Sequence, residues 1–108
     1  MREVRFLFSG EVGASLADKD HEKPVDNFSE HVKTMEGFHQ RYMVSNIACR
    51  DWVKRVRKMN IDMIVPQHGK PFKGKVIITE FLTWFEALEC GVDLMYSNNI
   101  LNANPAES

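Results

Sequence analysis

Two short apolar segments limit what this chain can fold into, because each is long enough for one β-strand and too short for a helix of ordinary length. The first is VRFLFSG (residues 4–10), and the second is IDMIVP (residues 61–66). Both contain β-branched or aromatic residues and end at a glycine or a proline, which is typical of buried strands. Two strands do not make a self-sufficient sheet. We therefore expect that a partner chain or a second copy adds strands to this sheet.

The residues between these strands predict a long loop followed by two helices. Residues 11–27 have neither a helical nor a strand period and contain a proline, so they form the loop. The first helix begins near its N-cap candidates, which are Asp26, Asn27 and Ser29. Its apolar face is Phe28, Val32, Met35, His39, Tyr42 and Met43. The second helix begins at the Ser-Asn pair of residues 45–46, and its inner face is Ile47, Trp52, Val53, Val56 and Met59.

A third helix is predicted over VIITEFLTWFEALEC (residues 76–90), with Gly91 as its stop. It is apolar on nearly every side, so we expect it to be covered on more than one side. Its aromatic stripe, Phe81, Trp84 and Phe85, is assigned to the core rather than to a cofactor site. The resulting order of strand, long loop, two helices, strand and helix is an α/β layer pattern.

Charge and cysteine usage narrow the class of protein. The formal net charge of −1 gives no case for a nucleic acid or an anionic membrane as partner. The basic run at residues 54–58 is expected on the solvated face of the second helix, near a C-terminus where cations suit the helix dipole. No apolar run is long enough to span a membrane. Cys49 and Cys90 form no CxxC or Cys-His cluster, so we expect a cytoplasmic protein with two free thiols and no cysteine nucleophile.

Two residues of metal-binding type directly follow the predicted strands. Glu11 comes after FLFSG, and His68 comes after MIVP in a Gln-His-Gly turn. Open α/β folds place their sites at the carboxyl ends of strands, and a carboxylate with an imidazole suits zinc, iron or manganese. Each residue alone has an ordinary explanation, a solvated acid for Glu11 and a turn-bonding histidine for His68. Their matched placement favours a metal site.

Other residues of ligand type lack such support. The loop motif DKDH contains Asp18, Asp20 and His21, which we interpret as a solvated acidic loop because nothing in it would orient the side chains. His39 falls on the apolar face of the first helix and is expected in the core or at an interface. His31, on the same helix, is expected to be exposed.

Two motifs resemble those of the C-terminal half of the metallo-β-lactamase fold. They are LFSGE, which ends at Glu11, and VPQHGKPFKG, whose His68 lies 57 positions after that glutamate. The resemblance is to its diiron branch, the flavodiiron proteins and the related oxygen-binding diiron proteins. GFHQRYM and CRDWVKRV resemble the two helices between these motifs. The resemblance spans residues 4–90. It implies a partial αββα layer over residues 1–95, completed by self-association, with a polar tail at residues 96–108.

By this resemblance Glu11 takes the position of a carboxylate that bridges two metals, and His68 that of a terminal ligand. The family has Asp where this chain has Glu11, so the carboxylate lies one methylene further out. The family's other ligands lie upstream, in an H-x-[HE]-x-D-H motif and a further histidine that this sequence lacks. The resemblance therefore implies an incomplete site. A missing N-terminal half or a partner chain would carry the other ligands. The implied metal is iron, two per complete site, with zinc as the alternative.

Three functions stay open on the sequence. The resemblance implies a fragment of a diiron protein that binds or reduces O2 or NO. The alternatives are a metal-dependent hydrolase of the same fold and a catalytically inactive, self-associating interaction module. We expect the isolated chain to be a homo-oligomer without activity of its own. We also expect it to bind metal weakly at most, because two ligands fall short of the three or four that zinc sites use.

Overall fold

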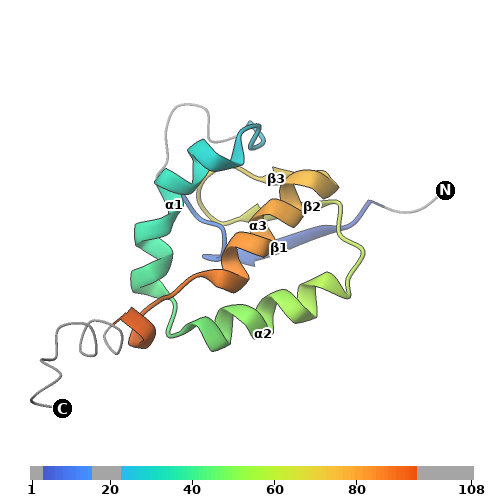
Figure 1. The fold of residues 1–108 in the computed structure, drawn as a ribbon. Coiled ribbons are helices and arrows are strands. Elements are labelled where there is room, and N and C mark those ends of the chain that lie inside the picture. Colours follow the sequence, from blue (N-terminus) through green and yellow to red (C-terminus); the bar gives the residue numbers. More distant parts are fainter. Residues whose placement is uncertain (1–3, 16–22, 95–108) are drawn as a thin grey trace, which may run out of the picture.

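The two apolar segments form strands that pair with each other in parallel, and a third, very short strand follows them. The computed structural model describes residues 4–15 and 23–94. Within these residues the elements are, in chain order, β1 (Phe6–Gly10), α1 (Phe28–Tyr42), α2 (Asn46–Arg57), β2 (Met63–Pro66), β3 (Phe72–Lys73) and α3 (Lys75–Ala87) (Figure 1). Parallel strands need a long crossover connection, and α1 and α2 lie within it.

The sheet has the order β1–β2–β3, and β3 runs antiparallel to β2. The predicted order of elements is wrong at this point, because it has a loop where β3 lies. Phe72 of β3 pairs with Ile64 of β2, and both side chains are fully buried. A strand of two residues is too short to show an alternating pattern, so the sequence carries no signal for it.

The first two helices begin as predicted, each with a side-chain cap. The Asn27 side chain accepts a hydrogen bond from the Glu30 amide at the start of α1. The Ser45 hydroxyl accepts one from the Ala48 amide at the start of α2. These bonds satisfy amides that the first turn of a helix leaves without a partner.

The predicted end of the third helix is wrong, because α3 ends at Ala87 rather than at residue 90. Gly91 is therefore not its stop. Gly91 has a φ of 48° and packs against the turn between α1 and α2, where an added Cβ would lie 2.4 Å from the carbonyl oxygen of Val44. Its amide donates to the carbonyl of Gln40 at 2.7 Å. Gly91 thus docks the segment after α3 onto the end of α1.

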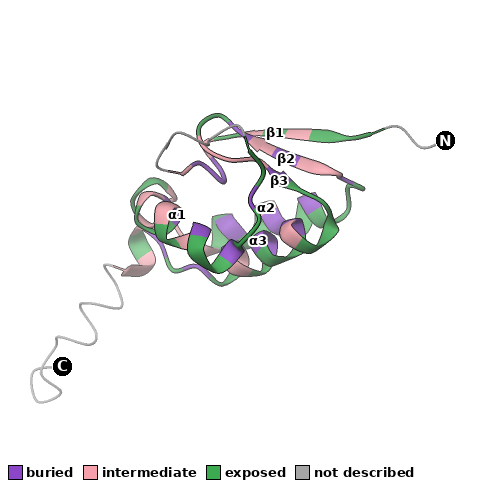
Figure 2. Ribbon diagram, turned by 90° about the horizontal axis from the view of Figure 1, so that it is seen from above, coloured by how far each residue is buried: buried purple, intermediate pink, exposed green. Residues whose placement is uncertain are grey.

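All three helices cover the same face of the sheet (Figure 2). The core lies between this face and α3, where the rings of Phe72 and Phe81 stack at 4.5 Å and those of Phe81 and Phe85 at 5.5 Å. The fully buried side chains include Met35, Val53, Ile64, Phe72, Phe81 and Phe85. The aromatic stripe of α3 is therefore part of the core, as predicted.

The opposite face of the sheet is open, and we call it the outer sheet face. It consists of Phe6 and Phe8 of β1 together with Met63 and Val65, their register partners on β2. Phe6 is 53% and Phe8 74% exposed, while Met63 and Val65 are half-buried. The prediction that both strands are buried is thus wrong for this face of β1.

Several predicted helix faces also differ from the structure. Tyr42, Ile47 and Met59 are exposed although their spacing predicts them inside. All three lie near helix ends: Tyr42 is the last residue of α1, Ile47 is the second residue of α2, and Met59 comes two residues after α2. His31 is buried rather than exposed, with its ring edge-on to Phe72 at 5.5 Å.

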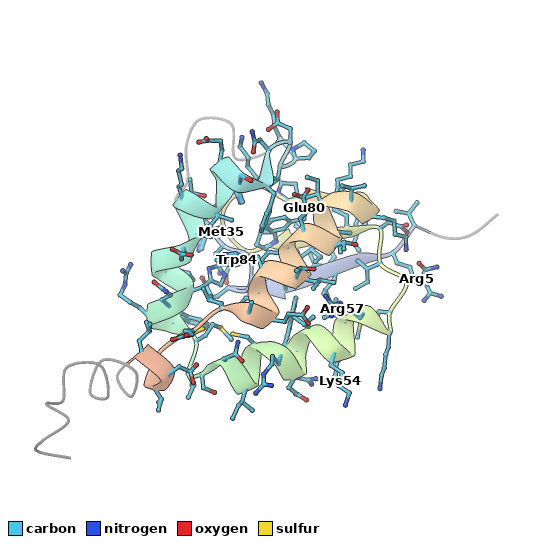
Figure 3. The ribbon with its side chains drawn as sticks, viewed as in Figure 1. Arg5, Met35, Lys54, Arg57, Glu80 and Trp84 are labelled. Atoms are coloured by element: carbon cyan, nitrogen blue, oxygen red, sulfur yellow. The ribbon has the colours of Figure 1, made fainter. Side chains whose placement is uncertain are left out.

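α3 has a solvated side, which corrects the prediction of a helix that is apolar on nearly every side. Its exposed residues are Lys75, Val76, Thr79, Glu80, Thr83 and Ala87. The basic run of α2 is exposed, as predicted, and Lys54 projects away from the body of the protein (Figure 3). None of the helices in the described ranges has the length and hydropathy to cross a membrane.

Candidate functional site

β1 and β2 end side by side, so the residues that follow them start from one edge of the sheet. Gly10 is paired with Pro66, and the amide of Gln67 donates to the carbonyl of Gly10 at 2.7 Å. Glu11 is the next residue after β1, and His68 comes two residues after β2. The structure therefore places the two predicted ligands after neighbouring strand ends. Glu11 is half-buried and His68 is exposed.

The two loops that carry these residues also contact each other. The Ser15 amide donates to the carbonyl of His68 at 3.3 Å. Gly69 has a φ of 96°, and an added Cβ would lie 2.0 Å from the Ser15 hydroxyl oxygen. A side chain at position 69 would force the loops apart, which explains the glycine after His68.

The loop after β1 is folded onto itself by short bonds. The Ser9 hydroxyl donates to the carbonyl of Val12 at 2.6 Å, and the Val12 amide returns a bond to the carbonyl of Ser9 at 3.2 Å. The Ala14 amide donates to the carbonyl of Glu11 at 3.0 Å. Val12 and Ala14 are buried. Glu11 thus starts a compact turn whose backbone is fixed at several points.

His39 of α1 contributes a further bond to this loop. Its Nε2 accepts the amide proton of Gly13 at 2.8 Å, and its Nδ1 lies 2.9 Å from the carbonyl of Met35. These partners assign the ring proton to Nδ1. Burial lowers the pKa of His39, while the bond to Met35 and the negative charge of Glu11 act in the opposite direction. His39 is therefore a neutral core histidine, in line with the prediction.

The donor types at the two strand ends fit iron, but their number does not make a complete site. Glu11 offers a carboxylate and His68 an imidazole. Within residues 4–15 and 23–94, no three or more His, Cys, Asp or Glu side chains gather as metal ligands. Asp18, Asp20 and His21 of the predicted acidic loop lie outside the described residues. The described part of the chain therefore offers two residues of ligand type at this edge of the sheet, which is fewer than a complete metal site needs.

The two cysteines form a buried pair rather than a reactive site. The Sγ atoms of Cys49 and Cys90 lie 3.5 Å apart, and both residues are free thiols. Burial raises the pKa of Cys49 to about 12 and raises that of Cys90. Both thiols stay protonated at neutral pH, so neither is a nucleophile. The sequence predicts free thiols, but it gives no sign that they touch.

A hollow of about 290 Å³ lies between the end of α2 and the start of α3. Its lining includes Val56, Ile61, Lys75 and Ile78. Ile61 precedes β2, so this hollow is at the strand ends opposite to Glu11 and His68. It is therefore separate from the candidate metal site.

Comparison with known proteins identifies the kind of domain that this arrangement belongs to. A family model described as ODP family beta lactamase matches residues 1–69, which include Glu11 and His68. A solved structure described as a peroxy diiron species of the chemotaxis sensor ODP is 42% identical, with a TM-score of 0.78. The apo state of the chemotaxis sensor ODP from T. denticola is 44% identical, with a TM-score of 0.79.

Each of these structural alignments covers 86% of this chain and 38% of the solved chain. The chain therefore spans less than half the length of these relatives. A comparison with curated proteins gave no match.

Proposed function

The chain belongs to the family described as ODP family beta lactamase, and on that premise we propose that it forms part of a diiron protein that binds O2. The observation that carries this proposal is the placement of Glu11 and His68 after the neighbouring ends of β1 and β2. Carboxylate and imidazole donors at one edge of a sheet are what an iron site of this kind needs. The relative described as a peroxy diiron species of a chemotaxis sensor favours O2 binding over hydrolysis.

In this proposal Glu11 and His68 each supply one ligand, and the bound iron supplies the redox chemistry. The chain's own contribution is geometric. The bond from Ser15 to the carbonyl of His68 and the close approach of Gly69 to Ser15 fix one ligand loop against the other. Metal–ligand distances tolerate only about ±0.2 Å, so this contact between the loops determines whether both ligands reach the same metal.

We propose that the remaining ligands come from the part of the domain that the solved relatives have and this chain does not span. That part lies either in the same polypeptide or on a partner chain. By itself the described chain would hold iron weakly through two ligands. Reduction of O2 or NO, flavin-dependent electron supply and hydrolysis all require groups beyond these two.

An anaerobic titration with Fe(II), followed by NMR on the ¹⁵N-labelled chain, tests the ligand assignment. Paramagnetic Fe(II) broadens the signals of residues close to where it binds. We expect broadening centred on Glu11 and His68, and we expect Glu11→Gln and His68→Ala each to remove it. Glu36→Gln on the exposed side of α1 is the matched charge control and should behave like the wild type. Unchanged broadening in both ligand variants would overturn the proposal.

We also propose that the isolated chain is a homo-oligomer that buries the outer sheet face. Phe6 and Phe8 are more than half exposed, and they lie on β1, an edge strand of the sheet. A second copy related by a twofold axis would cover this apolar face with its own outer sheet face. We place this contact at β1 rather than at α3, because Phe81 of α3 is already fully buried within one chain.

A further inference from the structure

His39 joins the helical layer to the loop that carries Glu11. It is fully buried in α1, and its Nε2 accepts the amide proton of Gly13 at 2.8 Å. The bonds already described for this loop end on the loop itself, on β1 or on the turn at His68. Within residues 4–15 and 23–94, the bond to His39 is the one that ties the Glu11 loop to a helix.

We propose that His39 is a positioning residue for the metal ligand Glu11, which it holds in place through the backbone of Gly13. This inference rests on the proposed function, because it assigns a role relative to that ligand. Gly13 is two residues from Glu11, and its amide is directed at a ring that cannot move freely. The loop is thereby fixed from α1 on one side and from His68 on the other.

The surroundings of His39 explain why its ring can serve as a fixed point. Its Nδ1 donates to the carbonyl of Met35 in the same helix at 2.9 Å. The rings of Trp84 and Phe85 from α3 meet it edge-on, with centroids 5.8 and 5.7 Å away. Met35 and Trp84 lie between α1 and α3 in Figure 3. Two hydrogen bonds and these aromatic contacts leave one orientation and one tautomer for the imidazole.

The position of Gly13 makes the bond hard to replace. Gly13 is buried with a φ of 89°, and an added Cβ would lie 2.9 Å from the ring of Phe72. Without the acceptor on residue 39, the Gly13 amide would stay in the core as an unsatisfied donor. The loop would then move outward to reach water, and the Glu11 carboxylate would lose its fixed place relative to His68.

Two substitutions at position 39 separate the hydrogen bond from the volume of the ring. Gln in His39→Gln carries an amide oxygen near the position of Nε2 and keeps an acceptor for Gly13. His39→Leu keeps an apolar side chain of similar size and removes the acceptor. Val53→Ala on α2 is the control for a general loss of packing, because Val53 is fully buried and far from the loop in sequence.

The first readout is hydrogen exchange of the Gly13 amide on the full chain, compared with amides in the core of α3. We expect His39→Leu to speed exchange at Gly13 about tenfold relative to that core, since the bond that protects it is gone. His39→Gln should retain most of the protection. Val53→Ala should change Gly13 and the α3 amides by the same factor. Equal protection of Gly13 in the wild type and in His39→Leu would overturn the inference.

The second readout is the anaerobic Fe(II) titration followed by NMR. We expect His39→Leu to weaken binding at Glu11 and His68 about tenfold, in the range found for residues that orient metal ligands. His39→Gln and Val53→Ala should stay close to the wild type. Equal Fe(II) binding in His39→Leu and the wild type would overturn the role of His39. If the wild type shows no broadening at Glu11, the proposed function fails, and Gly13 exchange still decides whether His39 holds the loop.

Discussion

On the helix side of the sheet, Ile64 and Phe72 are fully buried, whereas on the outer sheet face Phe8 is 74% exposed. The side chains on the two faces are equally apolar. The helix side is covered by α3 and its aromatic rings, and the outer sheet face is covered by nothing within the described residues (Figure 2). Parallel strands are normally covered on both faces. Within the described residues, the chain thus covers one of the two faces of its sheet.

The two faces also differ in what their apolar residues can do. The helix side stabilises the folded chain, because its side chains leave water when the chain folds. Phe6 and Phe8 of the outer sheet face gain little from folding and can gain from association.

The largest effect is expected for Phe85→Ala on the helix side. Phe85 is fully buried and its ring contacts Phe81, His39 and Trp52. Removing such a ring leaves a cavity and typically costs about 3–5 kcal/mol. Urea unfolding followed by circular dichroism measures the loss. Phe8→Ala is the matched control on the outer sheet face. At concentrations where the chain is monomeric, it should change the free energy of unfolding by less than about 0.5 kcal/mol. Similar losses in both variants would contradict the comparison.

The second prediction concerns association through the outer sheet face. Light scattering at micromolar concentration should give a mass above the 12.5 kDa of one chain. Phe6→Ser with Phe8→Ser should return the mass to that of one chain, since each buried ring contributes about 1.5–3 kcal/mol. Val76→Ser is the matched control, because Val76 is also 74% exposed but lies on α3. A wild-type chain that is monomeric and melts cooperatively would show that the outer sheet face tolerates water.

The sequence predicts where the helices and strands lie better than it predicts which of their faces are covered. Strand ends follow from Gly10 and Pro66, and the caps Asn27 and Ser45 place the starts of α1 and α2. Which face of β1 is covered does not follow, because a parallel strand is apolar on both faces. β3 is invisible in the sequence because two residues have no period.

The candidate site shows the same limit. That Glu11 and His68 start from one edge follows from the sequence, since parallel strands end on the same side of a sheet. The bond from Gly13 to His39 does not follow, because it joins residues far apart in the chain and a glycine amide leaves no trace in a side-chain pattern. The contact between the thiols of Cys49 and Cys90 does not follow from the sequence either, because these residues are also far apart in the chain.

The third prediction uses the titratable group on the helix side. Burial lowers the pKa of His39 below its ordinary value of 6.5, so the unfolded chain binds this proton more readily than the folded chain. The contribution of His39 to stability is therefore complete above pH 6.5 and declines as the pH falls below it. Urea midpoints measured between pH 5 and pH 8 (about 1.5 units on either side of the usual histidine value) should be lower on the acidic side. The dependence of the urea midpoint on pH should be weaker in His39→Gln. An unchanged dependence would contradict its assignment to His39.

The smallest effect is expected at the rim of the helical layer, where Arg57 of α2 meets Glu86 of α3. The guanidinium donates to both carboxylate oxygens of Glu86, at 2.7 and 2.9 Å (Arg57 is labelled in Figure 3). The two side chains are 43% and 34% exposed, so water competes with the pair and salt screens it. A double-mutant cycle with Arg57→Met and Glu86→Gln should give a coupling of about 0.5–1 kcal/mol that shrinks at high salt. The more exposed pair of Arg55 and Asp51 within α2, at 3.2 Å, is the control and should give less. A coupling energy larger than the stability lost in Phe85→Ala would mean that this ion pair, and not the aromatic core, holds the helical layer together.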